Sequence, residues 1–178
     1  MSQGRANLAA ALQRAQPRRI LVIDPDKNTA GAAYWAQTRE DGSCWVWGGD
    51  KGGAPLVDPR AAQSILAALT PDLVMVEAPI SGGGAFARSM HPQNVVRGGW
   101  LWLAGLAGIP VVQLAPASWQ PSVCKDKGPR KPQYKAHARA ILGGPVNEDA
   151  AAALCMLEFA LGIMGRALPH EIKRCSPC

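Results

Sequence analysis

The sequence has no apolar run long enough to cross a bilayer. Even the stretch from Trp100 to Val112 is short and interrupted by glycines and a proline, whereas a membrane-spanning helix needs about 20 apolar residues. The N-terminal residues are polar and basic and lack the apolar core of a signal peptide. We therefore expect a soluble, cytoplasmic protein with no membrane partner.

Cysteines are few, odd in number and scattered along the chain. Five cysteines make a poor disulfide framework, which fits a reducing compartment. Cys175 and Cys178 have the spacing of half a zinc knuckle, but no second pair of cysteines or histidines lies nearby to complete four ligands. An incidental tail is the simpler interpretation of this pair.

Acidic residues are outnumbered by basic ones, 13 to 19, and the formal net charge at pH 7 is +6. This balance suits a polyanionic partner without proving one. The 178 residues are enough for one ordinary domain and too few for two. We expect a flexible basic N-terminal arm over residues 1–18, a folded domain over 19–167 and a C-terminal tail over 168–178.

Alternating strand and helix patterns predict an α/β domain. The expected strands cover residues 20–24, 31–36, 43–47, 73–76 and 110–113. The expected helices cover 59–69, 94–106, 133–142 and 147–164, with a short one near 118. The first three strands are close enough in sequence to form an antiparallel meander, and a right-handed crossover makes the first and fourth strands neighbours.

Three acidic points stand where buried elements meet solvent. Asp24 and Glu77 each end a run of apolar residues, and Glu148 with Asp149 opens an alanine-rich segment. Because the sites of open α/β sheets lie at strand ends, we expect these carboxylates to collect at one sheet edge. Hard oxygen ligands from distant segments are what Mg²⁺ or Mn²⁺ requires. The resulting hypothesis is phosphodiester chemistry with two divalent ions, which stabilise the attacking and leaving oxygens.

Each acid also has a plainer interpretation when it is taken alone. Asp24, followed by Pro25, fits a turn or a helix cap. Glu148 and Asp149 fit the first turn of a helix, where the macrodipole favours acids. Glu77 is harder to explain in this way, because a carboxylate next to a core is costly unless it is paired or bound to a metal.

A basic segment precedes the last acidic point. Lys125, Lys127, Arg130, Lys131 and Lys135 stand among glycine and proline residues. Such a run is commonly a solvated loop, and its charge equally suits contact with the phosphates of a nucleic acid.

Six segments follow one another in an order that is hard to obtain by chance. They are residues 20–25 with the Asp, 74–77 with the Glu, 97–99, 109–111, 116–119 and 131–135. In this order they resemble the RuvC-type Holliday junction resolvases of the ribonuclease H-like superfamily, especially the phage and bacterial members. The resemblance implies a mixed five-stranded sheet flanked by helices, and a bacterial or phage-infected host cytoplasm.

The resemblance implies a structure-selective endonuclease that resolves four-way DNA junctions by paired symmetric nicks. Asp24 would bridge two Mg²⁺ or Mn²⁺ ions, while Glu77 and Asp149 would each complete one ion. Glu148 would be an auxiliary ligand. Lys131 matches the lysine that the family places near the scissile phosphate.

Contacts with branched DNA follow from the same resemblance. The residues expected to bind its backbone are Lys125, Lys127, Arg130, Lys131, Lys135 and Arg139. Ile80 and Phe86 would form an apolar wedge that unstacks bases at the crossover, or else anchor their loop on the core. Because a four-way junction is two-fold symmetric, paired nicks call for a homodimer. Residues 98–106, with Trp100 and Trp102, would form the interface or lie in the core.

The chain departs from the family pattern at two positions. Gln120 follows Trp119, where the family commonly has a lysine, so one phosphate contact would be either lost or supplied by Lys125. The last helix of the family carries an acid, two small residues and a second acid, whereas Ala152 stands three residues after Asp149. Both positions share one helix face. Either Glu148 compensates, or the chain is a disabled variant.

Three other functions compete with junction resolution. A nuclease for other branched or single-stranded nucleic acids would use the same metals. A ribonuclease H-like protein that binds DNA without cutting it would fit Ala152. An actin-like ATPase is disfavoured because the chain has room for only one of the two lobes that such enzymes need.

Overall fold

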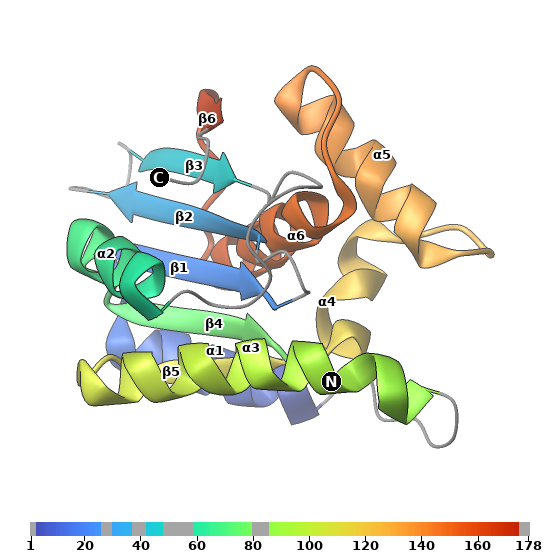
Figure 1. Ribbon diagram of the computed structural model, residues 1–178. Helices are drawn as coiled ribbons and strands as arrows, with labels where there is room; N and C mark the ends of the chain where they lie inside the picture. Colours follow the sequence, from blue (N-terminus) through green and yellow to red (C-terminus); the bar gives the residue numbers. More distant parts are fainter. Residues whose placement is uncertain (1–2, 26–29, 37–41, 48–58, 80–85, 175–178) are drawn as a thin grey trace.

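The computed structural model describes residues 3–25, 30–36, 42–47, 59–79 and 86–174. In these residues six strands form one sheet in the order β5-β4-β1-β2-β3-β6 (Figure 1). The strands are β1 (Arg19–Asp24), β2 (Ala30–Ala36), β3 (Gly42–Trp47), β4 (Leu73–Glu77), β5 (Val111–Leu114) and β6 (Ile172–Arg174). The first five match the expected strands, and β6 makes the predicted strand number wrong.

Strand pairing follows the predicted topology. β1 pairs antiparallel with β2, and β2 pairs antiparallel with β3, which confirms the meander. β4 lies parallel to β1 on its other side, and β5 lies parallel to β4. The carboxyl ends of β1 and β4 therefore meet at the same sheet edge, which faces α4 and α5 in Figure 1.

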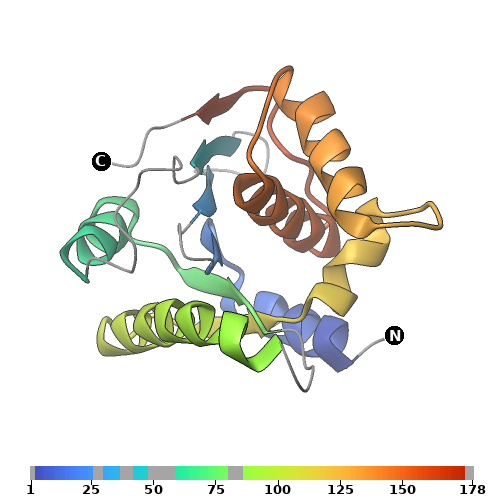
Figure 2. The ribbon, with the colours of Figure 1, turned by 45° about the vertical axis from the view of Figure 1, so that its right-hand side comes forward.

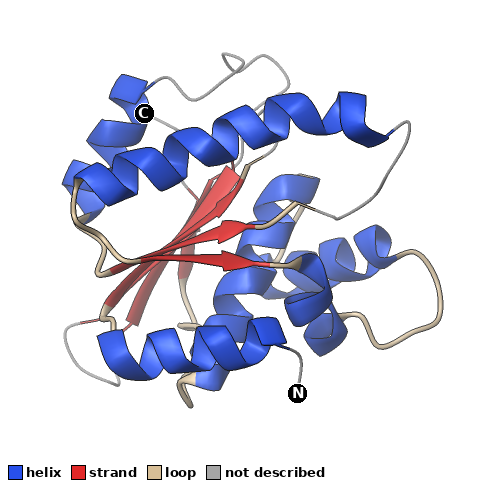
Figure 3. Ribbon diagram, turned by 90° about the horizontal axis from the view of Figure 1, so that it is seen from below, coloured by secondary structure: helices blue, strands red, loops and turns tan. Residues whose placement is uncertain are grey.

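Helices cover both faces of the sheet (Figure 3). They are α1 (Gln3–Ala15), α2 (Pro59–Leu69), α3 (Phe86–Leu106), α4 (Pro116–Val123), α5 (Arg130–Leu142) and α6 (Glu148–Ile163). Alternate residues of β1 enter two separate cores: Leu21 and Ile23 pack with α2 and α3, whereas Ile20 and Val22 pack with the other four helices. The fold is a three-layer α/β arrangement.

The helix α6 is the centre of the larger core. Its residues from Ala150 to Leu157 are all buried, and the run of four alanines at its start is compatible with a close approach to the sheet. A helix that is apolar on nearly every side belongs in a protein interior. Nevertheless, no helix in the described parts of the chain is long and apolar enough to cross a membrane.

The expected N-terminal arm is instead a docked helix. Leu8 and Leu12, four residues apart on α1, are buried in the core beneath the sheet. Burying a leucine side chain stabilises a fold by about 1.5–3 kcal/mol, so these two leucines can hold this short helix on the sheet. Residues 3–15 of the expected flexible arm therefore form a helix that is docked on the domain.

The expected C-terminal tail contributes the sixth strand. β6 pairs in parallel with β3, the edge of the meander. The side chain of Arg174 donates hydrogen bonds to the carbonyl oxygens of Pro145 and Leu142, at 2.8 and 3.1 Å. These bonds attach the end of the chain to the α5–α6 connection, so the tail interpretation fails for residues 172–174.

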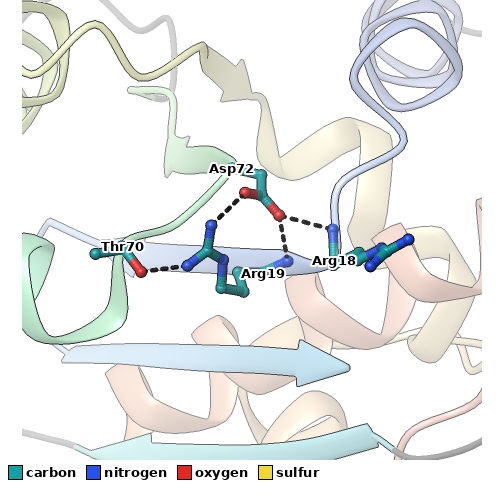
Figure 4. Close-up of polar contacts among 4 residues, drawn as sticks. All are labelled: Arg18, Arg19, Thr70 and Asp72. Atoms are coloured by element: carbon teal, nitrogen blue, oxygen red, sulfur yellow. Dashed lines mark hydrogen bonds and ion pairs between the residues drawn. The ribbon is translucent and has the colours of Figure 1, made fainter. Parts of the chain in front are cut away.

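A polar network ties the start of β1 to the start of β4 (Figure 4). A carboxylate oxygen of Asp72 accepts the backbone N–H groups of Arg18 and Arg19, both at 2.9 Å. The other oxygen pairs with the Arg19 guanidinium, also at 2.9 Å, which in turn donates to Thr70. These contacts fix the two parallel strands at the end opposite to the acidic edge.

Candidate metal and nucleic-acid site

Asp24 and Glu77 lie side by side at the carboxyl ends of β1 and β4. Their preceding residues, Ile23 and Val76, are register partners in the parallel pair. Both carboxylates line a cavity of about 140 Å³ at this edge. The parallel topology thus brings together two acids that are 53 residues apart in the sequence (77 minus 24).

The first turn of α6 supplies the other two acids. Asn147 caps this helix by accepting the N–H of Ala150 at 2.7 Å, and Glu148 and Asp149 follow it into the same cavity. The positive end of the helix macrodipole favours acids there. The helix-end interpretation of these acids and their place at the site are therefore compatible.

The pKa of Glu77 shows that its carboxyl is poorly solvated. Burial raises the pKa of this carboxyl to about 7. The charge of Asp149 acts in the same direction, while a hydrogen bond from Trp119, the charge of Lys131 and a hydrogen bond with Asp24 act against it. Glu77 therefore ionises less readily than an exposed glutamate.

Tyr134 of α5 faces the same group of acids. Burial raises the pKa of its hydroxyl well above the ordinary value, and the charges of Glu148, Asp24, Glu77 and Asp149 raise it further. One phenol thus senses all four carboxylates, which shows that they surround a common space.

The donor set suits a hard divalent cation. Carboxylate oxygens are the ligands that Mg²⁺ and Mn²⁺ prefer. A bound cation would also offset the repulsion between Glu77 and Asp149. The ligands are not fully assembled: within the described residues, no three histidine, cysteine or acidic side chains are close enough to hold a metal ion. A cation bound here by three or more of these carboxylates would require them to move closer together.

Ala152 stands at the position where the resemblance noted in the sequence implies a second acid. It lies one turn after Asp149 on α6, is only 3% exposed and lines the cavity. The expected shared face of these two positions is thus confirmed. A methyl group stands where the family pattern has a carboxylate.

Of the predicted basic residues, Lys131 alone lines the cavity, and its ammonium pairs with Glu148. Lys125 donates to the carbonyl of Pro121 at 3.2 Å, and Arg130 donates to the side chain of Gln120 at 3.0 Å. Gln120, which follows Trp119 on α4, lines the cavity, whereas Lys125 does not. The remaining basic candidates, Lys127, Lys135 and Arg139, lie on α5 or in the turn before it. Figure 2 shows α5 alongside α6.

The structure does not test the two wedge candidates. Ile80 lies outside the described residues, and Phe86 is the first residue of α3. Their predicted contact with DNA stays a prediction.

Sequence reasoning missed the wall that α3 gives to the cavity. Gln93, Asn94 and Arg97 line it, while Val96 and Trp100 on the same helix are buried in the core. The Arg97 Nε is buried and has no hydrogen-bond partner among the described residues. The sequence pattern that indicates this wall is the spacing of Gln93, Asn94 and Arg97, at i, i+1 and i+4, which puts three polar side chains on one face of α3.

Solved structures with the same architecture include RuvC of Thermus thermophilus. That structure has a TM-score of 0.56 and 19% identity, over 85% of this chain and 99% of that one. The fold of this chain is that of RuvC. RuvC of T. thermophilus in complex with a Holliday junction substrate gives a TM-score of 0.58 at 18% identity, over 85% of this chain and 98% of the RuvC chain.

More distant matches add little to this fold assignment. The yeast mitochondrial Holliday junction resolvase Ydc2 has a TM-score of 0.48 and 16% identity, over 91% of this chain and 90% of its own. No protein-family model matches the chain, and no curated protein sequence does.

Proposed function

We propose that this protein is a divalent-metal-dependent endonuclease that resolves four-way DNA junctions by paired symmetric nicks. One observation supports this proposal above all: carboxylates from β1, β4 and α6 line one cavity of a RuvC fold, together with a lysine. Fold alone does not define an activity. Carboxylates that can bind a divalent metal, placed next to the ammonium of Lys131, suit the hydrolysis of a phosphate ester.

The four acids would hold the cations. Asp24, at the end of the central strand β1, would bridge two ions, with Glu77 and Asp149 completing one each and Glu148 assisting. When bound, such ions supply an activated water and stabilise the leaving oxygen. Asp24 and Glu77 are carried by central strands, so their backbone is fixed before the substrate arrives.

Lys131 would neutralise charge on the scissile phosphate. It reaches the cavity from the first turn of α5 and pairs with Glu148 there, and its side chain is 71% exposed, so an incoming phosphate can reach it. Lys135 and Arg139, further along α5, would hold the DNA backbone. Arg97 on the α3 wall would offer a second cation from across the cavity.

A homodimer would match the two-fold symmetry of a junction. The structure separates the two tryptophans of the candidate interface: Trp100 is buried, whereas Trp102 is 66% exposed. Val95 and Leu106 are exposed as well and lie on the same stripe of α3 as Trp102. We place the dimer contact on this stripe, because large exposed apolar side chains in a group commonly mark protein contacts.

Binding without cleavage is the second candidate, and Ala152 favours it. The cavity lacks the carboxylate that the family pattern places at this position. A chain with three strong ligands and one auxiliary would still recognise a junction through its basic α5 surface.

A cleavage assay with a labelled four-way junction and a matched linear duplex tests these alternatives. The junction nuclease predicts paired nicks at symmetric positions that need Mg²⁺ or Mn²⁺ and that the duplex does not receive. Tight junction binding without nicks would favour the non-cleaving protein. Equal binding and equal cleavage of the junction and the duplex would contradict both candidate functions.

A further inference from the structure

The best-defined polar contact at the site joins Trp119 to Glu77. The indole Nε1–H of Trp119 donates to Oε1 of Glu77 at 3.0 Å. Trp119 is completely buried on α4, and Glu77 is half-buried at the end of β4. The contact holds one oxygen of the carboxylate and leaves the charge of the group intact.

The surrounding structure holds the indole in place from two sides. The chain turns directly from β5 into α4, with Pro116 as the first helical residue, and the N–H of Ala78 bonds the carbonyl of Leu114 at 2.9 Å. On the other side, the ring of Tyr134 packs on that of Trp119, with centroids 5.5 Å apart. The donor is therefore fixed relative to the end of β4.

Packing alone does not require this hydrogen bond. Trp100 is as deeply buried as Trp119, and its Nε1 has no partner among the described residues. The fold thus accommodates a buried indole without a hydrogen bond. The placement of the Trp119 N–H on a site carboxylate calls for a separate explanation.

The chemistry of the indole N–H explains why a tryptophan stands next to a site carboxylate. An indole N–H donates only, carries no charge and does not ionise. It can orient a carboxylate without neutralising it, whereas an ammonium such as that of Lys131 competes with a cation for its partner. Groups that orient metal ligands in this way affect metal affinity by about 10- to 100-fold.

We propose that Trp119 is a positioning residue for Glu77, holding one carboxylate oxygen so that the group keeps the orientation in which it meets a divalent cation. This inference rests on the proposed metal-dependent function. It adds a residue that neither binds the metal nor touches the substrate. It also links α5, through Tyr134 and Trp119, to the end of β4.

The test compares Trp119→Phe with Trp100→Phe in the full-length protein without DNA. Each change removes an indole N–H from a buried tryptophan, but only the first removes a hydrogen bond to Glu77. The readouts are the dissociation constant for Mn²⁺, from electron paramagnetic resonance of the free ion, and the thermal midpoint without metal. We expect Trp119→Phe to weaken Mn²⁺ binding by about tenfold or more, and Trp100→Phe to leave it unchanged.

Unchanged Mn²⁺ affinity in a folded Trp119→Phe protein would overturn the inference. Equal weakening in both variants would overturn it as well, since the cause would then be core packing. If Trp119→Phe does not fold, 3-benzothienylalanine in place of Trp119 keeps the bicyclic shape without the N–H. The inference and the proposed function can fail separately. Mn²⁺ binding that depends on Trp119, in a protein that cuts no junction, would support the role of Trp119 and contradict the proposed nuclease activity.

Discussion

Ala152 and Asp149 lie one helical turn apart on α6 and both line the acidic cavity. This relationship predicts that Ala152→Asp adds an oxygen ligand to the site. We expect faster junction cleavage in Mg²⁺, by about tenfold or more, which corresponds to about 1.4 kcal/mol of transition-state stabilisation. The measurement is the single-turnover cleavage rate at saturating protein.

The matched control for this change is Ala153→Asp, at a fully buried neighbouring position that does not line the cavity. It should destabilise the protein without accelerating cleavage, because a carboxylate buried away from the site finds no cation. If Ala152→Asp cuts no faster than the parent chain, Glu148 already compensates for the missing acid.

Lys131→Met should slow cleavage more than it weakens DNA binding. Lys131 lines the cavity, where we propose that it meets the scissile phosphate, whereas Lys127 stands in the turn before α5. Lys127→Met removes the same charge and should mainly lower affinity and reduce its salt dependence. Cleavage rates and binding constants at several salt concentrations separate the two variants. Equal effects of both changes on the cleavage rate would argue against a role for Lys131 in the chemistry.

Asp72→Ala should lower the free energy of unfolding by about 1–3 kcal/mol, because backbone N–H groups at the start of β1 lose a charged acceptor. Urea unfolding at neutral pH measures this difference. Asp126→Ala is the control, since Gln133 contacts only backbone atoms of Asp126. That change should cost less than about 0.5 kcal/mol.

The effect of Asp72 should also depend on pH. Burial raises the pKa of its carboxyl, but hydrogen bonds from the Arg19 side chain and from the backbone of Arg19 and Arg18, with the Arg19 charge, outweigh burial and leave the pKa lowered. The stability due to Asp72 is then fully present above its unfolded pKa of about 3.9 and is lost as the pH falls through the lower folded value. A difference between wild type and Asp72→Ala that grows toward acid pH would contradict this network.

Trp102→Glu should convert a dimer to a monomer. Trp102 is exposed on α3 beside Val95 and Leu106, and a charge there would oppose burial against a second chain. Sedimentation velocity measures the change, with Gln13→Glu on the exposed side of α1 as the control. A wild-type protein that is monomeric at micromolar concentration would contradict the predicted dimer, and a Trp102→Glu variant that stays dimeric would place the contact elsewhere.

The sequence was most informative where local patterns decide the structure. The meander, the 59–69 helix and the neighbouring positions of Asp24 and Glu77 follow from apolar runs, turn residues and the handedness of crossovers. These features depend on residues that are close together in the chain or on rules that apply to every sheet.

Features that depend on distant partners escaped the sequence. The docking of Leu8 requires a sheet that forms elsewhere, and β6 is only three residues long and depends on the contacts of Arg174. Likewise, Trp119 and Arg97 were visible as motif residues, but their places at the cavity depend on how α3 and α4 pack. Side-chain roles of this kind need tertiary structure.

Crystals soaked in Mn²⁺ test the central claim most directly, because anomalous scattering locates this ion without assumptions about activity. The account predicts anomalous peaks in the cavity between Asp24, Glu77 and Asp149, and their loss in Asp24→Asn crystals soaked in the same way. A cavity without any peak, in crystals whose packing leaves it open to solvent, would contradict the assignment of these carboxylates to a metal site.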